Sequence, residues 1–373
     1  MLAKITKADG TNIDANSAGP INLTLHSMFK EIAVELNGRN IGDTSQLYAY
    51  RSFIETALNF SKETQETRLL CEGWTKDTTG HIGVTTVGGN NAGLNARAAT
   101  FATSTVVELV GRPHSDVFHM DRLIPPEIDL NLKLMPSADN IVCKSAAPVG
   151  QAVQENFKME IIGVTLIIRT KQLTSTALDA QNQLLISQPM RSHYSRVQPK
   201  HLSIPANTTS IYFDNVFTGA LPDLVIVCLM SDADFAGGYQ RNPFNFQNFG
   251  INRMELKRNG TSVPGNGYTP NFANGRYTKD YMTFLEQFEC DTGDKCISLT
   301  PAEWANGYNL YAFKITDGPI GPGTIGPRSK SATGSARLEV AFAAAPNENI
   351  KVILVYQMLG RFEFDKYRNV TVL

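Results

Sequence analysis

The sequence predicts an all-β protein made of two antiparallel β-sandwiches in tandem. Apolar residues alternate with polar or small ones over many short stretches, which is typical of strands with one buried face. The chain has 373 residues, which is too long for one ordinary small domain and suits two of roughly 150 to 200 residues. Because 29 glycines and 18 prolines punctuate the chain, long loops are expected between the strands.

Individual strands can be assigned from the apolar pattern. Residues 32–36, 128–134 and 337–342 each place apolar side chains on one face. Two further runs, 161–168 and 224–230, are nearly continuous in apolar side chains, which predicts strands covered on both faces. Each half then holds about eight strand candidates, and eight antiparallel strands in two facing sheets form a jelly roll. The predicted architecture is therefore a double jelly roll with a few short helices in loops.

Two segments are predicted to form helices, one in each half. Their apolar residues are spaced so that they fall on one helical face. Thr44 and Ser45 precede the first helix as possible N-caps. The two stripes are Leu47, Tyr50, Ile54 and Leu58 in the first helix, and Tyr277, Tyr281, Leu285 and Phe288 in the second.

The order of elements repeats between the halves. A strand leads into Asn37-Gly38 before the first helix, and another leads into Asn259-Gly260 before the second. Asn-Gly provides the positive φ angles of a tight hairpin turn, so Asn37, Gly38, Asn259 and Gly260 are predicted structural turns. Long apolar strands are expected to close the halves, over 158–169 in the first and over 351–358 and 361–364 in the second. This shared order indicates an old duplication.

The predicted boundaries follow from this repeat. We assign residues 1–173 to the first jelly roll and residues 196–373 to the second. Residues 174–195 are polar, mix helical and loop residues, and contain Pro189. They are predicted to be the linker.

Charge and composition exclude several classes of function. The chain has 34 Lys plus Arg against 35 Asp plus Glu, and no three basic residues are adjacent, so direct specific nucleic-acid binding is not expected. The longest wholly apolar run, 224–230, is too short to span a membrane. Residues 1–30 lack the pattern of a signal peptide, so the protein is expected to be made inside a cell and not secreted.

Five scattered cysteines without CxxC spacing are expected to be reduced thiols: Cys71, Cys143, Cys228, Cys290 and Cys296.

Several residue groups resemble sites, and the plainer interpretation is favoured for each. Asp232 and Asp234 could serve a glycosidase, but carboxylates at a strand end are usually only solvated. The glycine-rich stretch 318–326 lacks the donors and the GK[ST] of a phosphate loop. No catalytic residue, cofactor site or metal site is predicted. His114, Asp116, His119 and Asp121 lie close enough in the sequence to suggest metal ligands, but no second cluster is present to complete the site.

An aromatic cluster near residue 245 is predicted to pack in the core or between subunits. A ligand platform is the alternative, but large rings dominate buried interfaces. The four residues are Tyr239, Phe244, Phe246 and Phe249.

The residues that carry the repeat also resemble a known family, the double jelly-roll major capsid proteins of Polinton (Maverick) elements and adintoviruses. Each motif is short, but together they occur in the family's order along nearly the whole chain. The motifs are Lys4-Ile-Thr-Lys-Ala-Asp-Gly10, Gly19-Pro-Ile-Asn22, Leu25-His-Ser-Met-Phe29, Leu36-Asn-Gly38, Tyr48-Ala-Tyr-Arg-Ser-Phe-Ile-Glu-Thr56, Gly111-Arg-Pro-His-Ser-Asp-Val-Phe118, Gly219-Ala-Leu-Pro222, Asn242-Pro-Phe-Asn-Phe246 and Gly307-Tyr-Asn-Leu-Tyr-Ala-Phe313.

The resemblance implies a structural protein of a virion and not an enzyme. Such a subunit would form a homotrimer whose six jelly rolls give a pseudo-hexameric capsomer of an icosahedral shell around double-stranded DNA. Its partners would be copies of itself, neighbouring capsomers, and penton and minor capsid proteins. Members of the family usually carry sequence ahead of the motif at Lys4, so the opening strand of the first jelly roll is expected to be shortened here. A carbohydrate-binding or glycan-cleaving jelly-roll protein is the alternative function.

Overall fold

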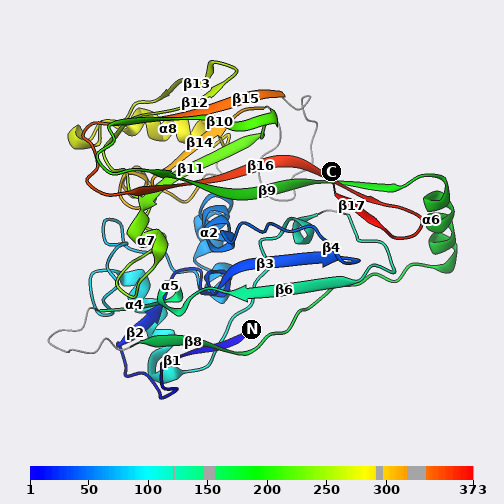
Figure 1. Ribbon diagram of the computed structural model, residues 1–373. Coiled ribbons are helices and arrows are strands. Elements are labelled where there is room, and N and C mark those ends of the chain that lie inside the picture. Colours follow the sequence, from blue (N-terminus) through cyan, green and yellow to red (C-terminus); the bar gives the residue numbers. More distant parts are fainter. Residues whose placement is uncertain (121, 147–155, 291–296, 317–332, 373) are drawn as a thin grey trace.

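The computed structural model describes residues 1–120, 122–146, 156–290, 297–316 and 333–372. Its first half holds three small antiparallel sheets (Figure 1). Their strands, in spatial order, are β5 (Val107–Glu108), β1 (Leu2–Lys7) and β8 (Phe157–Gly163); β4 (Arg39–Asn40), β3 (Phe29–Leu36) and β6 (Leu130–Pro136); and β2 (Ala18–Pro20) with β7 (Cys143–Ser145). The helices are α1 (Thr24–Ser27), α2 (Tyr48–Asn59), α3 (Lys62–Gln65), η1 (Arg68–Glu72), α4 (Ala92–Thr100), η2 (Ala102–Ser104), η3 (Asp116–His119) and α5 (Asp139–Val142).

The second half contains two larger antiparallel sheets. One has the order β10 (Ser210–Ala220), β15 (Thr333–Phe342), β12 (Ile251–Arg258) and β13 (Thr261–Tyr268). The other has the order β14 (Leu310–Lys314), β11 (Leu224–Ser231), β16 (Ile350–Phe364) and β17 (Val370–Val372), with β9 (Met190–Ile204) paired along β16. The helices are α6 (Ser175–Ser187), α7 (Asp232–Ala236), η4 (Phe272–Asn274), α8 (Thr278–Glu286) and α9 (Pro301–Ala305).

The protein is mostly β with short helices, which confirms the predicted fold class. In β15, the buried residues Leu338, Val340 and Phe342 alternate with partly exposed ones, as the sequence pattern predicts. Every residue of β11 is buried, as expected for a strand covered on both faces.

The two halves repeat one arrangement around their hairpins. Leu36 pairs with Arg39 across Asn37-Gly38, and Arg258 pairs with Thr261 across Asn259-Gly260, so both loops contain two residues. All four turn residues have positive φ angles: 46° and 74° in the first turn, 48° and 84° in the second. The strand orders β4-β3-β6 and β13-β12-β15 correspond. A helix follows each hairpin, α2 in the first half and α8 in the second.

Two details of the prediction are wrong. Residues 164–169 do not continue the closing strand of the first half, because Leu2, the first residue of β1, already lies opposite Gly163 at the end of β8. Thr44 and Ser45 do not cap α2, whose N-cap is Leu47 without a side-chain hydrogen bond. Ser45 instead donates its hydroxyl to Asp43 at 2.5 Å.

The segment assigned to the linker contains regular structure. It comprises α6 and the first residues of β9. Helix α6 lies at the end of an arm that extends from the body of the molecule (Figure 1). No described helix is long and apolar enough to cross a membrane.

The two halves share one hydrophobic core. Helix α2, from the first half, lies beneath the sheet that contains β9 and β16 from the second (Figure 1). Its residues Phe53, Ile54 and Leu58 belong to the same buried cluster as Ile226 of β11 and Val355 of β16. Burial of this apolar surface is the main force that holds the halves together.

Candidate functional site: a buried polar seam

Arg51 of α2 lies at the centre of a polar network where the halves meet. Its Nε donates to Glu55 Oε1 at 2.9 Å, its Nη1 donates to the carbonyl oxygen of Val197 in β9 at 2.8 Å, and its Nη2 donates to Asp116 Oδ1. The amide of Val197 also donates to Asp116 Oδ1, at 3.3 Å. One guanidinium therefore ties α2 and η3 of the first half to the first strand of the second half.

The network continues through two histidines into the first half. His114 Nδ1 lies 2.6 Å from Glu55 Oε2, and the backbone amide of His114 donates to the Tyr48 hydroxyl at 3.0 Å. The same hydroxyl lies 2.8 Å from His26 Nδ1, and His26 Nε2 lies 3.2 Å from Glu72 Oε2. These five side chains are buried.

Burial sets the protonation states of this network. It lowers the pKa of His26 to about 4, although the hydrogen bond with Glu72 acts in the opposite direction. It raises the pKa of Asp116 to about 6, in spite of the charge of Arg51. Burial would also raise the pKa of Glu55, but Arg51 and His114 outweigh it and lower that pKa to about 2. At pH 7 the two carboxylates are therefore ionised and His26 is neutral.

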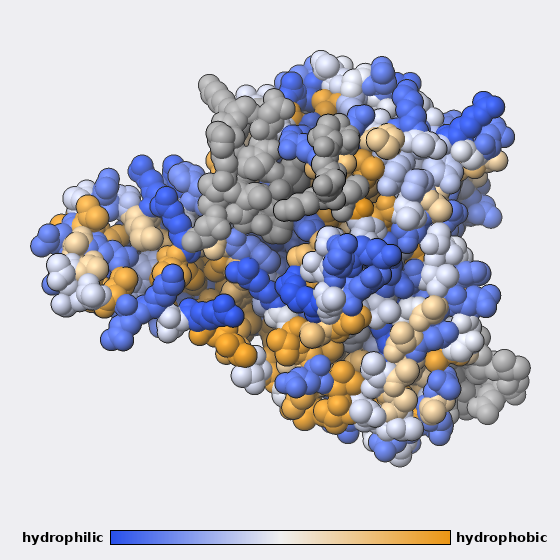
Figure 2. Space-filling model, turned by 180° about the vertical axis from the view of Figure 1, so that it is seen from behind, coloured by the Kyte–Doolittle hydropathy of each residue, from blue (hydrophilic) through white to orange (hydrophobic). Residues whose placement is uncertain are grey.

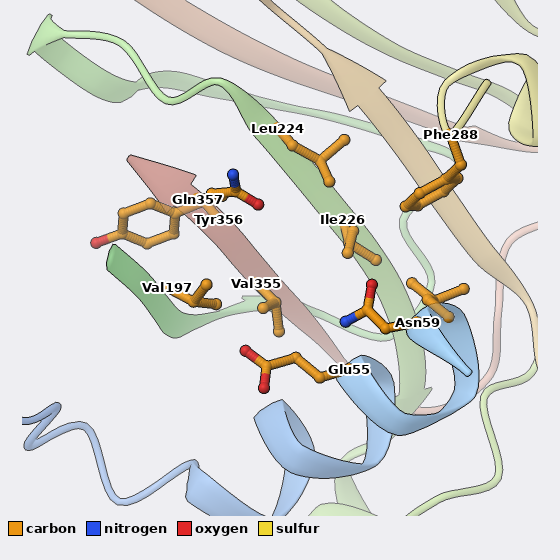
Figure 3. Close-up of a pocket in the computed structure, with 10 residues that line it drawn as sticks. Glu55, Asn59, Val197, Leu224, Ile226, Phe288, Val355, Tyr356 and Gln357 are labelled. Carbon is orange, nitrogen blue, oxygen red and sulfur yellow. The ribbon is translucent and has the colours of Figure 1, made fainter. Parts of the chain in front are cut away.

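We call the network of Arg51, Glu55, Asp116, His114, Tyr48, His26 and Glu72 the seam. A small cavity adjoins it. It encloses about 30 Å³ between α2 and the sheet of the second half, and Glu55, Val197, Ile226 and Val355 are among the residues that line it (Figure 3). This space has room for a water molecule.

The predicted aromatic residues lie at the same junction, in the segment that follows α7. Phe244 and Phe246 are 1% and 0% exposed, and both contact Phe53 of α2. The Tyr239 hydroxyl donates to the carbonyl oxygen of Phe157 in β8 at 2.9 Å. Phe249 is partly buried against the core. All four therefore pack within the chain.

The predicted turn residues lie elsewhere, at hairpin ends, and their asparagines bind backbone of other segments. Asn37 donates its Nδ2 to the carbonyl oxygen of Arg368 at 2.7 Å. Asn259 Oδ1 accepts from the amide of Ser335 at 2.9 Å. These contacts indicate a structural role for both turns.

In the described structure, members of the other groups considered in the sequence lie in separate contacts. Asp232 pairs with Lys351 at 3.3 Å, and Asp234 pairs with Arg241 at 3.4 Å, so the two carboxylates serve separate ion pairs. His119 Nε2 lies 3.2 Å from the carbonyl oxygen of Pro113. Asp121, Cys296 and the glycine-rich stretch 318–326 lie outside the described residues. Cys71 is an exposed thiol, and Cys143 and Cys228 are buried thiols.

Sequence reasoning missed the seam, although its residues fall in three of the motifs that carry the family resemblance. His26 lies in the motif at 25–29, Arg51 and Glu55 in that at 48–56, and His114 and Asp116 in that at 111–118. Glu72 lies outside these motifs. Spacing along the chain could not show that the segments meet, because the contacts join residues as many as 146 positions apart.

An exposed apolar segment follows β8. Residues 162–168 form no regular structure beyond Gly163, and Val164, Ile167 and Ile168 are 51%, 80% and 57% exposed. Ile186 of α6 is 72% exposed. A view from behind shows apolar atoms gathered on the lower part of the molecule, beside the base of the arm (Figure 2). Apolar surface of this kind marks a contact site in many proteins.

Comparison with known proteins identifies the architecture. No family model matches the chain. The uncharacterized protein F54H12.2 of Caenorhabditis elegans is 23% identical over 314 residues, which covers 80% of this chain and 68% of that protein. A chain in the cryo-EM structure of the Sputnik virophage has a TM-score of 0.57 at 10% identity, covering 100% of this chain and 80% of its own. The Faustovirus major capsid protein has a TM-score of 0.50 at 8% identity, covering 96% and 76%.

These likenesses establish the fold. They extend over both halves, and the protein therefore has the double jelly-roll fold of viral major capsid proteins.

Proposed function

We propose that the protein is a major capsid protein, the structural subunit of a virus-type shell. The observation that carries this proposal is the likeness of the whole chain, both jelly rolls included, to a chain of the Sputnik virophage. The buried seam suits such a role. A shell subunit bears mechanical force from its neighbours, so its two halves must keep a fixed orientation relative to one another. The shared core and the Arg51 network supply that rigidity.

In its finer form, the proposal is a homotrimer with a pseudo-hexameric outline in an icosahedral shell around double-stranded DNA. Two similar jelly rolls in each of three subunits give six similar bodies around one axis, and closed symmetry stops each capsomer from growing further. The exposed apolar residues 162–168 are the candidate subunit contact. The motif order of the sequence supports a shell of the Polinton and adintovirus group, with penton and minor capsid proteins as further partners and the virion as the location.

The test is the oligomeric state of the purified chain. Size-exclusion chromatography with light scattering, followed by electron microscopy, is expected to show trimers with a hexagonal outline. The double variant Val164→Ser and Ile167→Ser should shift the mass towards the monomer. Leu70→Ser, a similarly exposed leucine of η1 at 52%, is the matched control and should leave the trimer intact. A stable monomer that binds glycans would instead support the carbohydrate-binding alternative.

A further inference from the structure

Two histidines and a glutamate converge in the interior of the first half. His26 of α1, Glu72 of η1 and His114 each offer one ligand atom, and these atoms all lie within 4.8 Å of one another. The imidazole rings of the histidines meet edge to face, with centroids 4.7 Å apart. The three residues come from segments separated by up to 88 positions, so the fold and not local sequence brings them together.

In each histidine, one ring nitrogen is already held by a partner outside this group. Nδ1 of His26 lies 2.8 Å from the Tyr48 hydroxyl, and Nδ1 of His114 lies 2.6 Å from Glu55 Oε2. Glu55 is in turn fixed by Arg51. Metal-binding histidines are typically oriented in this way, because a hydrogen bond at one nitrogen fixes the ring and directs the other nitrogen at the ion.

The remaining ring nitrogens have weaker partners. His114 Nε2 is 3.4 Å from Thr56 Oγ1, which is a long hydrogen bond. His26 Nε2 is 3.2 Å from Glu72 Oε2, a separation close to that of two ligands on one tetrahedral zinc ion. An inward movement of His114 would complete the set.

The charges of the region are also unbalanced. Arg51 contacts both Glu55 and Asp116 and can neutralise only one of these carboxylates. The Glu72 side chain is 5% exposed. The guanidinium of Arg68, which is half-exposed, lies 3.9 Å from the Glu72 carboxylate, a long distance for an ion pair. Buried carboxylates are costly unless they are paired or bind a metal, so a divalent cation would lower the free energy of this region.

We propose that His26, Glu72 and His114 bind a divalent transition-metal ion, with Zn²⁺ the best match to two imidazoles and one carboxylate. The side chains are 3%, 5% and 4% exposed, so a substrate cannot reach the ion and its role is structural. The ion would fasten α1, η1 and the segment before η3 to one another beneath α2. This inference does not depend on the capsid function, because it concerns the interior of a single chain.

The first test is metal binding by the untagged full-length protein. After incubation with Zn²⁺ and removal of free ion, elemental analysis is expected to find one zinc per chain. His26→Gln and Glu72→Gln should lose that zinc, while the matched control His119→Gln should retain it. His119 is a suitable control because its ring lies 6.0 Å from that of His114 but it is not one of the three ligands. Absence of stoichiometric zinc in the wild type, or equal zinc in His26→Gln, would overturn the proposal.

A second measurement does not depend on the folding of variants. X-ray absorption of the zinc-loaded wild type is expected to show a shell of nitrogen and oxygen with two imidazoles. A sulfur ligand, or three or more imidazoles, would place the ion elsewhere and overturn the assignment. Tyr48→Phe removes the hydroxyl that holds both His26 Nδ1 and the backbone amide of His114. It should weaken zinc binding about 10- to 100-fold, the usual effect of losing an outer hydrogen bond.

Discussion

The rings of Phe53 and Phe244 stack face to face, with centroids 4.2 Å apart and planes 12° apart. Phe53 belongs to α2 in the first half, and Phe244 belongs to the segment after α7 in the second. Both side chains are 1% exposed. The stack therefore joins the two jelly rolls at the centre of their shared core.

Phe53→Ala and Phe244→Ala are each expected to lower the free energy of unfolding by about 3–5 kcal/mol, because each leaves a cavity in a packed core. Urea unfolding followed by circular dichroism measures the loss, and a single transition for the wild type would reflect the shared core. Tyr367→Ala, at a residue that is 73% exposed, is the control and should change stability by about 0.5 kcal/mol or less. Two separate transitions in the wild type would contradict this account of the core.

The aromatic residues illustrate how far the sequence could lead. Burial of Phe244 and Phe246 follows from their composition and pattern, but the identity of their partner does not, because Phe53 lies almost two hundred positions away. The hairpin turns could be predicted in full, since Asn-Gly encodes its φ angles locally. The apolar run 161–168 was predicted to be a strand covered on both faces, but only residues 161–163 belong to β8 and Val164, Ile167 and Ile168 are exposed. An apolar run does not specify whether a neighbouring strand is available to pair with it. Neither His26 nor Glu72 carried a local signal of metal binding, since only the tertiary fold brings them to His114.

Removal of the seam guanidinium is the second prediction. Arg51→Met leaves Glu55 and Asp116 buried without their cation, and we expect a loss of about 3–5 kcal/mol in the free energy of unfolding. Arg191→Met is the matched control, because Arg191 forms an exposed ion pair with Glu363 at 2.9 Å, and such pairs contribute at most about 1 kcal/mol. Chemical denaturation at pH 7 measures both.

A further variant separates charge from packing at the seam. Adding Glu55→Gln and Asp116→Asn to Arg51→Met removes the uncompensated negative charges and should restore part of the lost stability. Equal stability of the single and triple variants would show that the guanidinium acts through its packing and not through its charge.

The hairpin turns give a third prediction. Gly38→Ala and Gly260→Ala force a Cβ into a positive φ, which should cost about 1–2 kcal/mol at each position. An added Cβ would meet no atom within 4 Å at either glycine, so backbone strain alone is measured. Gly265→Ala in β13 is the control, since that position is equally open but lacks a positive φ. A cost at Gly265 as large as at Gly260 would argue against the strain explanation.

The pH dependence of stability provides the last prediction, through Lys144 of β7. Its Nζ donates to the carbonyl oxygens of Asn140 at 2.9 Å and of Gly238 at 3.0 Å, so it links the two halves from a buried position. Burial lowers the pKa of Lys144 from 10.5 to about 7. Between pH 7 and pH 10.5, Lys144 binds more protons in the unfolded chain than in the folded one. The contribution of Lys144 to the free energy of unfolding therefore increases as the pH rises from 7 and decreases as the pH falls back to 7.

Lys144→Met should remove this dependence. The difference in unfolding free energy between wild type and Lys144→Met, measured at pH 7, 8 and 9, is expected to move in favour of the wild type by up to about 1.4 kcal/mol per pH unit. Taking the difference cancels the groups that titrate equally in both proteins. Lys62→Met, at a side chain that is 72% exposed, is the control for loss of a lysine at the surface. If the Lys144→Met difference stays constant with pH, the buried amine keeps its ordinary pKa and its two carbonyl contacts replace the lost solvation.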